Sequence, residues 1–194
     1  MVSAPSGDIR YLSESVQRAI KIVVAGPFGV GKTTMVRTLS EISPLSTEET
    51  MTQASAAIDD LAGIKDKTTT TVAMDFGRVT LNKQLVLYLF GAPGQSRFQR
   101  LWQDLTYGAF GALVLTDTRR LDQSFNAIDR LEEAGLPYAV AVNEFPDSPT
   151  YDEERLRKAL DLLPETPLVI CDARDRMSAT NALINLAEHL LTLS

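Results

Sequence analysis

The sequence predicts an α/β domain built on a doubly wound sheet of six strands, five parallel and one antiparallel, with helices on both faces. A glycine-rich phosphate-loop pattern at 26–33 stands between an apolar run and a helical pattern, which indicates a strand–loop–helix unit. Segments 72–80 and 85–90 both have strand patterns and only four residues lie between them, so they must form an antiparallel hairpin. The near-continuous apolar runs at 111–117 and 138–142 alternate with helical patterns, as expected of parallel strands buried on both faces.

Length and composition indicate one globular domain. We expect a nucleotide-binding domain over residues 19–194, preceded by a weakly ordered extension, 1–18, that begins with small and polar residues. A net charge of −6 argues against broad nucleic-acid binding, which needs a basic surface. The single cysteine, Cys171, excludes an internal disulfide and a cysteine-based zinc cluster. The sequence has no signal peptide and no apolar run long enough for a membrane span, so we expect a cytoplasmic protein.

Residues 26–33 read Gly-Pro-Phe-Gly-Val-Gly-Lys-Thr and fit the phosphate-loop pattern G-x-x-x-x-G-K-[ST] at every fixed position. The strand at 19–25 precedes them and the helix at 33–40 follows, so inward-facing N–H groups and the helix N-terminus can cradle a polyphosphate. Lys32 is expected to reach the β and γ phosphates, and the Thr33 hydroxyl to hold Mg²⁺. The residues expected to bind the nucleotide here are Gly26, Phe28, Gly29, Val30, Gly31, Lys32, Thr33 and Thr34.

A long polar connection from residue 44 to residue 71 follows, with a possible helix around 51–61, and we expect it to emerge beside the nucleotide. Four threonines close it. The last, Thr71, could offer its hydroxyl to Mg²⁺ and its N–H to a γ phosphate, although such a run also simply favours extended structure. In the next strand, Asp75-Phe76-Gly77 imitates the metal motif of protein kinases. No H-R-D loop precedes it, and in a strand Phe76 can pack while Asp75 faces outward, so we expect no metal site there.

The hairpin is followed by residues 91–98, Gly-Ala-Pro-Gly-Gln-Ser-Arg-Phe, which resemble the D-x-x-G-Q box of the Ras-like small GTPases. The resemblance implies a three-layer P-loop GTPase fold whose antiparallel strand lies at the sheet edge. It also implies that the Gly94 N–H meets the γ phosphate and that Gln95 orients the attacking water. The sequence departs from the family at Gly91, which stands where an aspartate normally completes the Mg²⁺ shell.

The absent aspartate, together with the Pro-Gly-Gln core, resembles the bacterial MglA-like GTPases. The chain is similar to the conservon-type GTP-binding proteins (CvnD-like) of actinobacteria, and this likeness runs from about 21 to 191. Three segments carry it: Gly-Pro-Phe-Gly-Val-Gly-Lys-Thr-Thr, Thr-Val-Ala-Met-Asp-Phe-Gly and Cys-Asp-Ala-Arg-Asp. It implies GTP/GDP and Mg²⁺ as cofactors. It also implies a roadblock/LC7-type regulator and a histidine-kinase-like sensor as partners, through which peripheral membrane association could occur.

The strand at 138–142 leads into Asn143-Glu144-Phe145-Pro146-Asp147, at the sheet edge where ligands of open α/β sheets bind. The GTPase family reads N-K-x-D here. By this resemblance Asn143 ties the base pocket to the phosphate loop. Pro146 stands where the guanine-reading aspartate should be, and Asp147 comes one place later. Either Asp147 substitutes for that aspartate or base selectivity is relaxed.

A charged helix at 152–160 and a last strand at 168–170 lead to Cys171-Asp172-Ala173-Arg174, which resembles the family's S-A-K/L box. The resemblance implies that the Ala173 N–H meets the base carbonyl and that Arg174 covers the ring, with Asp172 in the same loop. Cys171 itself is expected to be a small core residue. A closing amphipathic helix follows.

The helix expected at 98–107 allows two interpretations of its side chains. Arg97 or Arg100 could reach the transferring phosphate in cis, or both could be surface or partner contacts. Phe98 and Trp102 could form an aromatic partner anchor or pack in the core.

These features favour a Mg²⁺-dependent GTP-binding switch with slow hydrolysis, in which Gln95 positions water while Lys32 and Mg²⁺ on Thr33 and Thr71 stabilise the developing charge. The alternative is a non-hydrolysing nucleotide-dependent scaffold with relaxed base specificity, which the residues Gly91 and Pro146 favour. ATP hydrolysis or small-molecule phosphorylation is a third possibility, disfavoured because no lid-sized insertion follows the core.

Overall fold

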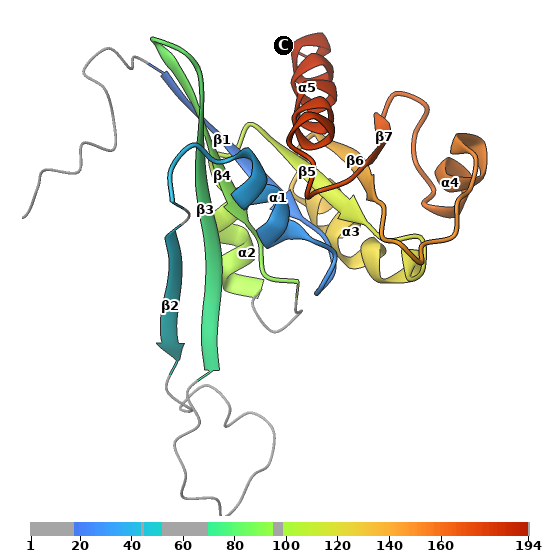
Figure 1. Cartoon of the computed structure of the whole chain (residues 1–194), viewed down its shortest axis with the longest axis horizontal. Helices are drawn as coiled ribbons and strands as arrows, with labels where there is room; N and C mark the ends of the chain where they lie inside the picture. The colour runs from blue at the N-terminus through green and yellow to red at the C-terminus, as the bar shows by residue number, and fades with distance from the viewer. Residues whose placement is uncertain (1–17, 44, 52–69, 95–98, 194) are drawn as a thin grey trace, which may run out of the picture.

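The computed structural model describes residues 18–43, 45–51, 70–94 and 99–193, which form a single seven-stranded sheet with helices on both faces (Figure 1). The strand order is β2-β3-β4-β1-β5-β6-β7. The elements are β1 (Arg18–Ala25), α1 (Lys32–Leu39), β2 (Leu45–Met51), β3 (Thr70–Asn82), β4 (Leu85–Gly91), α2 (Gln99–Thr106), β5 (Gly111–Thr116), η3 (Leu121–Ser124), α3 (Phe125–Glu133), β6 (Tyr138–Asn143), α4 (Glu153–Ala159), β7 (Leu168–Cys171) and α5 (Arg176–Thr192).

Five strands, β4, β1, β5, β6 and β7, are mutually parallel, and β3 runs antiparallel to β4. This arrangement confirms the predicted P-loop GTPase type of α/β fold. Because the parallel strands point the same way, the loops that follow them gather at one edge of the sheet. The phosphate loop, the segment 91–94 and the loops after β5, β6 and β7 therefore meet at this carboxyl edge.

The seventh strand corrects the prediction for the connection 44–71. Residues 45–51 form β2, which pairs antiparallel with β3 and replaces β3 at the edge of the sheet. The sequence of β2, Leu-Ser-Thr-Glu-Glu-Thr-Met, lacks a regular apolar alternation. β2 instead supplies hydrogen-bond partners for the backbone N–H and C=O groups on the outer edge of the long strand β3. The helix expected at 51–61 falls, beyond Met51, outside the described residues.

Both faces of the sheet are covered, with α1 and α5 on one side and α2 and α3 on the other (Figure 1). Alternate residues of β1 serve the two cores, so Ile22 packs with α1 and α5 while Val23 packs on the other face. This double burial explains why β5 and β6 read as near-continuous apolar runs. Within the described ranges, no helix has both the length and the apolar character needed to cross a membrane.

Candidate nucleotide-binding site

The phosphate loop connects β1 to α1 at the carboxyl edge of the sheet. Its last residue, Gly31, has φ 104°, and a side chain there would place its Cβ 2.6 Å from the Asn143 Nδ2 atom. Only glycine suits this position. Because Gly31 is also the residue that precedes α1, no side chain caps the first turn of the helix. The positive end of the helix is therefore open toward the loop, where an anion would be stabilised.

Lys32 is held inside this loop. Its Nζ atom donates hydrogen bonds to the carbonyl oxygens of Gly26, at 2.9 Å, and Pro27, at 2.6 Å. Burial lowers the pKa of the ammonium to about 8, although the nearby Asp75 carboxylate opposes this shift. Among the described residues its hydrogen-bond partners are two carbonyls, which are weaker acceptors than phosphate oxygens.

The lowered pKa predicts that nucleotide affinity falls above pH 8. A bound phosphate favours the charged ammonium and raises its pKa, so binding at pH values above about 8 must take up a proton. The affinity should be nearly constant from pH 7 to 8 and then fall by up to about tenfold per pH unit. Titrations of GDP between pH 7 and 9 measure this. Lys32→Arg, which does not titrate in this range, should bind with little pH dependence, and an equally flat wild-type profile would contradict the prediction.

Thr33 makes the contact that sequence reasoning missed. Its Oγ1 atom donates to the Asp75 Oδ2 atom at 2.5 Å, and Asp75 is only 7% exposed. The expectation that Asp75 faces outward is therefore wrong. Residues 75 and 77 lie on the face of β3 covered by α1, whereas Phe76 packs against Phe90, with ring centroids 5.1 Å apart.

Gly91, the position at which the family aspartate is missing, pairs directly with Asp75 across the β3–β4 hairpin. A Cβ at Gly91 would lie 3.1 Å from the Asp75 Cβ and 3.3 Å from its Oδ2. The two positions thus share one space, and the neighbouring strand supplies a carboxylate there. The signal in the sequence was an acidic residue in the strand that pairs with the altered box.

The segment after β4 lies directly against the phosphate loop. A Cβ at Gly94 would be 2.5 Å from the Phe28 backbone nitrogen, so any side chain at this position would collide with the loop. The Trp102 Nε1 atom donates to the Pro93 carbonyl at 3.0 Å, and Trp102 projects from α2 into the core that α2 and α3 cover. Trp102 is therefore a core residue that braces this segment, rather than a partner anchor.

Several predicted residues are not brought to the site. Thr71 lies within β3, where its backbone pairs with Thr50, and only its backbone is described. It stands four residues from Asp75, about 13 Å along a strand, so the structure does not bring it to Thr33. Gln95, Arg97 and Phe98 lie outside the described residues, as does the side chain of Arg100. Their roles stay predictions.

Asn143 connects the phosphate loop to the loop after β7. Its Nδ2 donates to the Val30 carbonyl at 2.9 Å, and its Oδ1 accepts from the Ala173 N–H at 2.8 Å. Asn143 is 4% exposed. The geometry matches the tie expected of Asn143. It also corrects the expectation for Ala173, because this N–H is already donated to Asn143 and does not point freely at a base carbonyl.

Asp172 and Arg174 pair with each other in the same loop. Arg174 donates through Nε, at 2.9 Å, and Nη2, at 2.7 Å, to the Asp172 carboxylate. These bonds lower the pKa of Asp172 to about 2. The Arg174 guanidinium is therefore directed at Asp172 in this structure, and covering a base would require the pair to open. Cys171 is buried, which raises the pKa of its thiol to about 12 and leaves it unsuited to nucleophilic chemistry.

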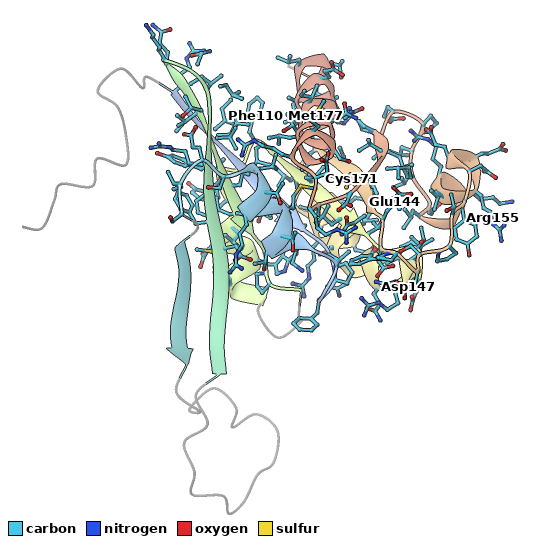
Figure 2. All side chains as sticks on the ribbon, in the orientation of Figure 1. Phe110, Glu144, Asp147, Arg155, Cys171 and Met177 are labelled. Atoms are coloured by element: carbon cyan, nitrogen blue, oxygen red, sulfur yellow. The ribbon has the colours of Figure 1, made fainter. Side chains whose placement is uncertain are left out.

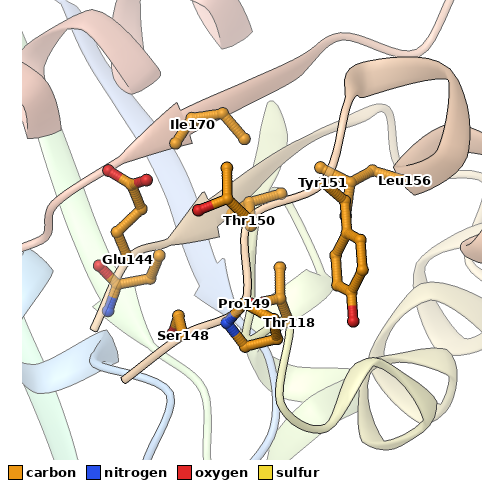
Figure 3. Close-up of a pocket in the computed structure, with 10 residues that line it drawn as sticks. Thr118, Glu144, Ser148, Pro149, Thr150, Tyr151, Leu156 and Ile170 are labelled. Atoms are coloured by element: carbon orange, nitrogen blue, oxygen red, sulfur yellow. The ribbon is translucent and has the colours of Figure 1, made fainter. Parts of the chain in front are cut away.

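Asp147 lies on an exposed turn after β6, farther out on the domain than Glu144 and Cys171 (Figure 2). The turn closes with a hydrogen bond from the Ser148 N–H to the Phe145 carbonyl at 3.0 Å, and proline suits its second position, residue 146. A small pocket of about 40 Å³ lies behind this loop, between Glu144, Ile170 and residues 148–151 (Figure 3). No phosphate-loop residue lines the pocket.

A family model described as a conserved hypothetical ATP binding protein matches residues 24–193, from the end of β1 to the end of α5. The chain belongs to this family. The match spans every loop of the carboxyl edge described above, so the ATP-binding family model and the candidate site cover the same part of the chain. No curated protein matches the sequence of this family member.

Solved GTPase domains share the fold of this ATP-binding family member. The G domain of the FeoB iron transporter of T. maritima has a TM-score of 0.62 and 18% identity, over 89% of this chain and 99% of that domain. The FeoB G-domain of Methanococcus jannaschii has a TM-score of 0.61 and 14% identity, over 90% and 99%. Elongation factor SelB of Methanococcus maripaludis, bound to the GTP analogue GPPNHP, has a TM-score of 0.59 and 16% identity, over 91% of this chain.

These likenesses establish the fold alone, because every identity is below one fifth. The chain spans 34% of the SelB chain and 64% of a T. maritima FeoB cytosolic domain solved in a GDP form. The resemblance to the MglA-like and conservon-type GTPases stays a prediction.

Proposed function

We propose that the protein is a Mg²⁺-dependent, guanine-nucleotide-binding switch that hydrolyses GTP slowly. The observation that carries this proposal is the pair formed by Thr33 and Asp75, which places a hydroxyl and a buried carboxylate beside the phosphate loop. Support for guanine comes from the neighbouring folds, since a FeoB cytosolic domain is described in GDP and GMPPNP forms and SelB with GPPNHP.

The residues present fit a Mg²⁺ ion bound together with a polyphosphate. Mg²⁺ takes oxygen ligands and is usually held by one or two side chains, with substrate phosphates and water completing the shell. In the part of the chain that the structure describes, no group of three or more acidic, histidine or cysteine side chains could hold a metal alone. Thr33 and Asp75 would hold the ion, which would offset negative charge on the phosphates.

The chain's own groups would carry the remaining steps. Lys32 exchanges its two loop carbonyls for phosphate oxygens, and the helix N-terminus at Gly31 stabilises the added charge. Gly94, at which any side chain would collide with the Phe28 backbone, would let the segment 91–94 respond to a terminal phosphate. Loss of that phosphate would release the segment, and Trp102 would pass the change to α2.

Gln95→Leu is expected to leave nucleotide affinity unchanged and to slow GTP hydrolysis by roughly tenfold or more, because leucine cannot orient the attacking water. Single-turnover hydrolysis and a binding titration, run on the same preparation, measure the two effects. Unchanged turnover would assign the chemistry to another residue.

A competition titration tests the proposal as a whole. GTP, GDP, ATP and XTP would compete against a fluorescent guanine nucleotide, with Mg²⁺ and with a chelator. We expect guanine preference that depends on Mg²⁺. Comparable affinity for ATP and GTP would favour the second candidate, a non-hydrolysing nucleotide-dependent scaffold, which the family description and the residues Gly91 and Pro146 support.

The cellular setting is part of the same proposal. A role in bacterial signalling in the cytoplasm, with a roadblock/LC7-type regulator and a histidine-kinase-like sensor, is supported only by the resemblance of the sequence motifs to the conservon-type proteins. Co-purification of the chain with such a regulator in the GTP-loaded but not the GDP-loaded form is the expected result.

A further inference from the structure

A buried carboxylate directly after β5 fixes an arginine at the carboxyl edge of the sheet. Asp117 is fully buried, and Arg119 donates to it through its backbone N–H at 3.0 Å, through Nε at 3.0 Å and through Nη2 at 2.7 Å. A guanidinium with two of its nitrogens on a buried carboxylate has little freedom to rotate. These bonds lower the pKa of Asp117 despite its burial, so the carboxylate stays charged.

The remaining nitrogen of Arg119 reaches the next loop. Nη1 donates to the Asp147 Oδ1 atom at 2.7 Å, and the guanidinium lies over the Phe145 ring, 4.2 Å from its centroid. Arg119 therefore joins the loop after β5 to the loop after β6, on which the base-reading residue is expected. Sequence reasoning did not single out Arg119, because its two carboxylate partners are 2 and 28 positions away.

Among the described residues, Arg119 is the main restraint on the Asp147 side chain. Its side chain is 72% exposed, and Asp147 is not among the residues that line the small pocket beside residues 148–151 (Figure 3). A free aspartate on such a turn would sample several rotamers. Arg119 selects one of them, and it uses only one of roughly four acceptor positions on the carboxylate.

We propose that Arg119 is the positioning residue through which Asp147 distinguishes guanine from adenine. The inference rests on the proposed function, in that a purine nucleotide must bind at this edge. Guanine presents two adjacent donors, N1–H and the 2-amino group, and a carboxylate with free acceptor positions can bind both. Adenine presents an acceptor at N1, which faces a carboxylate unfavourably. Pro146 occupies the position at which the base-recognising aspartate is expected, so Asp147 stands one residue later. The anchored Arg119 holds the Asp147 carboxylate in a defined orientation.

Dissociation constants for GDP and ADP test the proposal, in wild type, Arg119→Ala, Asp147→Ala and the double variant. We expect each single variant to lower the preference for GDP over ADP by roughly tenfold or more, with the ADP affinity unchanged. The double variant should be no worse than Asp147→Ala alone, because Arg119 acts only through Asp147. A merely structural role for Arg119 would instead weaken both nucleotides and would add to the loss in the double variant.

Two further variants guard against misfolding. Arg119→Ala leaves the buried Asp117 charge without its main partner, so the combination Asp117→Asn with Arg119→Gln removes both charges and should lower the preference equally. Arg155→Ala is the matched control, because Arg155 also stacks on an aromatic ring, that of Tyr151 at 4.6 Å, and should keep the wild-type preference.

The outcomes separate the two proposals. If wild type binds neither nucleotide, the proposed function fails and the role of Arg119 falls with it. If wild type binds both but prefers neither, or if both Arg119 variants keep the preference for GDP, the proposed nucleotide site survives and the role of Arg119 is overturned.

Discussion

Lys32→Ala is expected to lower the affinity for GDP by about 10²–10⁴-fold, since charge-assisted hydrogen bonds are each worth about 1.5–3 kcal/mol and two such bonds to phosphate are lost. The Nζ atom bonds the carbonyls of Gly26 and Pro27 from inside the loop. Isothermal titration calorimetry with GDP and Mg²⁺ at pH 7.5, below the lowered pKa of Lys32, gives the change directly.

Lys21→Ala is a closely matched control. Lys21 also bonds two backbone carbonyls through Nζ, those of Asp104 at 3.0 Å and Tyr107 at 2.9 Å, but it does so on the helix α2 side of the sheet. The affinity of this variant should equal that of wild type. Tight binding retained by Lys32→Ala, with both variants folded, would remove the phosphate-loop role from residues 26–33.

The phosphate loop could be predicted from the sequence because its determinants are local. A strand, a glycine-rich turn and a helix follow one another within residues 18–39, and the glycine at 31 is required by its own backbone angle and by one neighbouring side chain. The parallel strands could also be predicted, since burial on both faces leaves a continuous apolar run. Strand β2 could not, because it depends on the unpaired edge of β3 and not on its own side-chain pattern.

The place of Asp75 depends on the register of a hairpin, which the sequence does not reveal. A four-residue turn at 81–84 would pair Thr80 with Leu85 and set Asp75 opposite Phe90. In the structure Asn82 pairs with Leu85 across a two-residue turn, and an irregularity follows, so that Asp75 lies opposite Gly91. A shift of one residue moves a side chain to the other face of a sheet. The contact with Thr33 follows from that shift.

The loops after β6 and β7, where the base is expected to bind, were also only partly predictable from the sequence. Asn143 could be recognised from its motif, and it does join the phosphate loop to the loop after β7. Two other contacts could not be predicted from the sequence: the hydrogen bond from the Ala173 N–H to Asn143 and the ion pair of Asp147 with Arg119. Each arises from the approach of two loops that are distant in sequence. Motifs identify which residues are present at such an edge, and the fold decides which of their donors and acceptors are still free.

Exchanging the residues at positions 75 and 91 should have large effects on Mg²⁺-dependent nucleotide binding and on stability. Asp75→Gly is expected to lower the ratio of GDP affinity in Mg²⁺ to that in chelator by about tenfold or more, because the hydroxyl of Thr33 loses its carboxylate partner. Gly91→Asp alone should destabilise the fold by about 1–3 kcal/mol, since it forces a second side chain into the space of the first. That loss corresponds to roughly 2–4 °C of melting temperature per kcal/mol for a domain of this size.

The double variant, with glycine at 75 and aspartate at 91, decides whether the two positions are alternatives. Paired directly across β3 and β4, they point to the same face, so a carboxylate from either strand can reach the space beside Thr33. We expect the double variant to regain both the melting temperature and the Mg²⁺ dependence of wild type, which two independent defects would not do. If it stays as insensitive to Mg²⁺ as Asp75→Gly, a carboxylate at 91 cannot serve the site. If Asp75→Gly itself keeps the wild-type ratio, Asp75 is a structural partner of Thr33 and the cation is held without it.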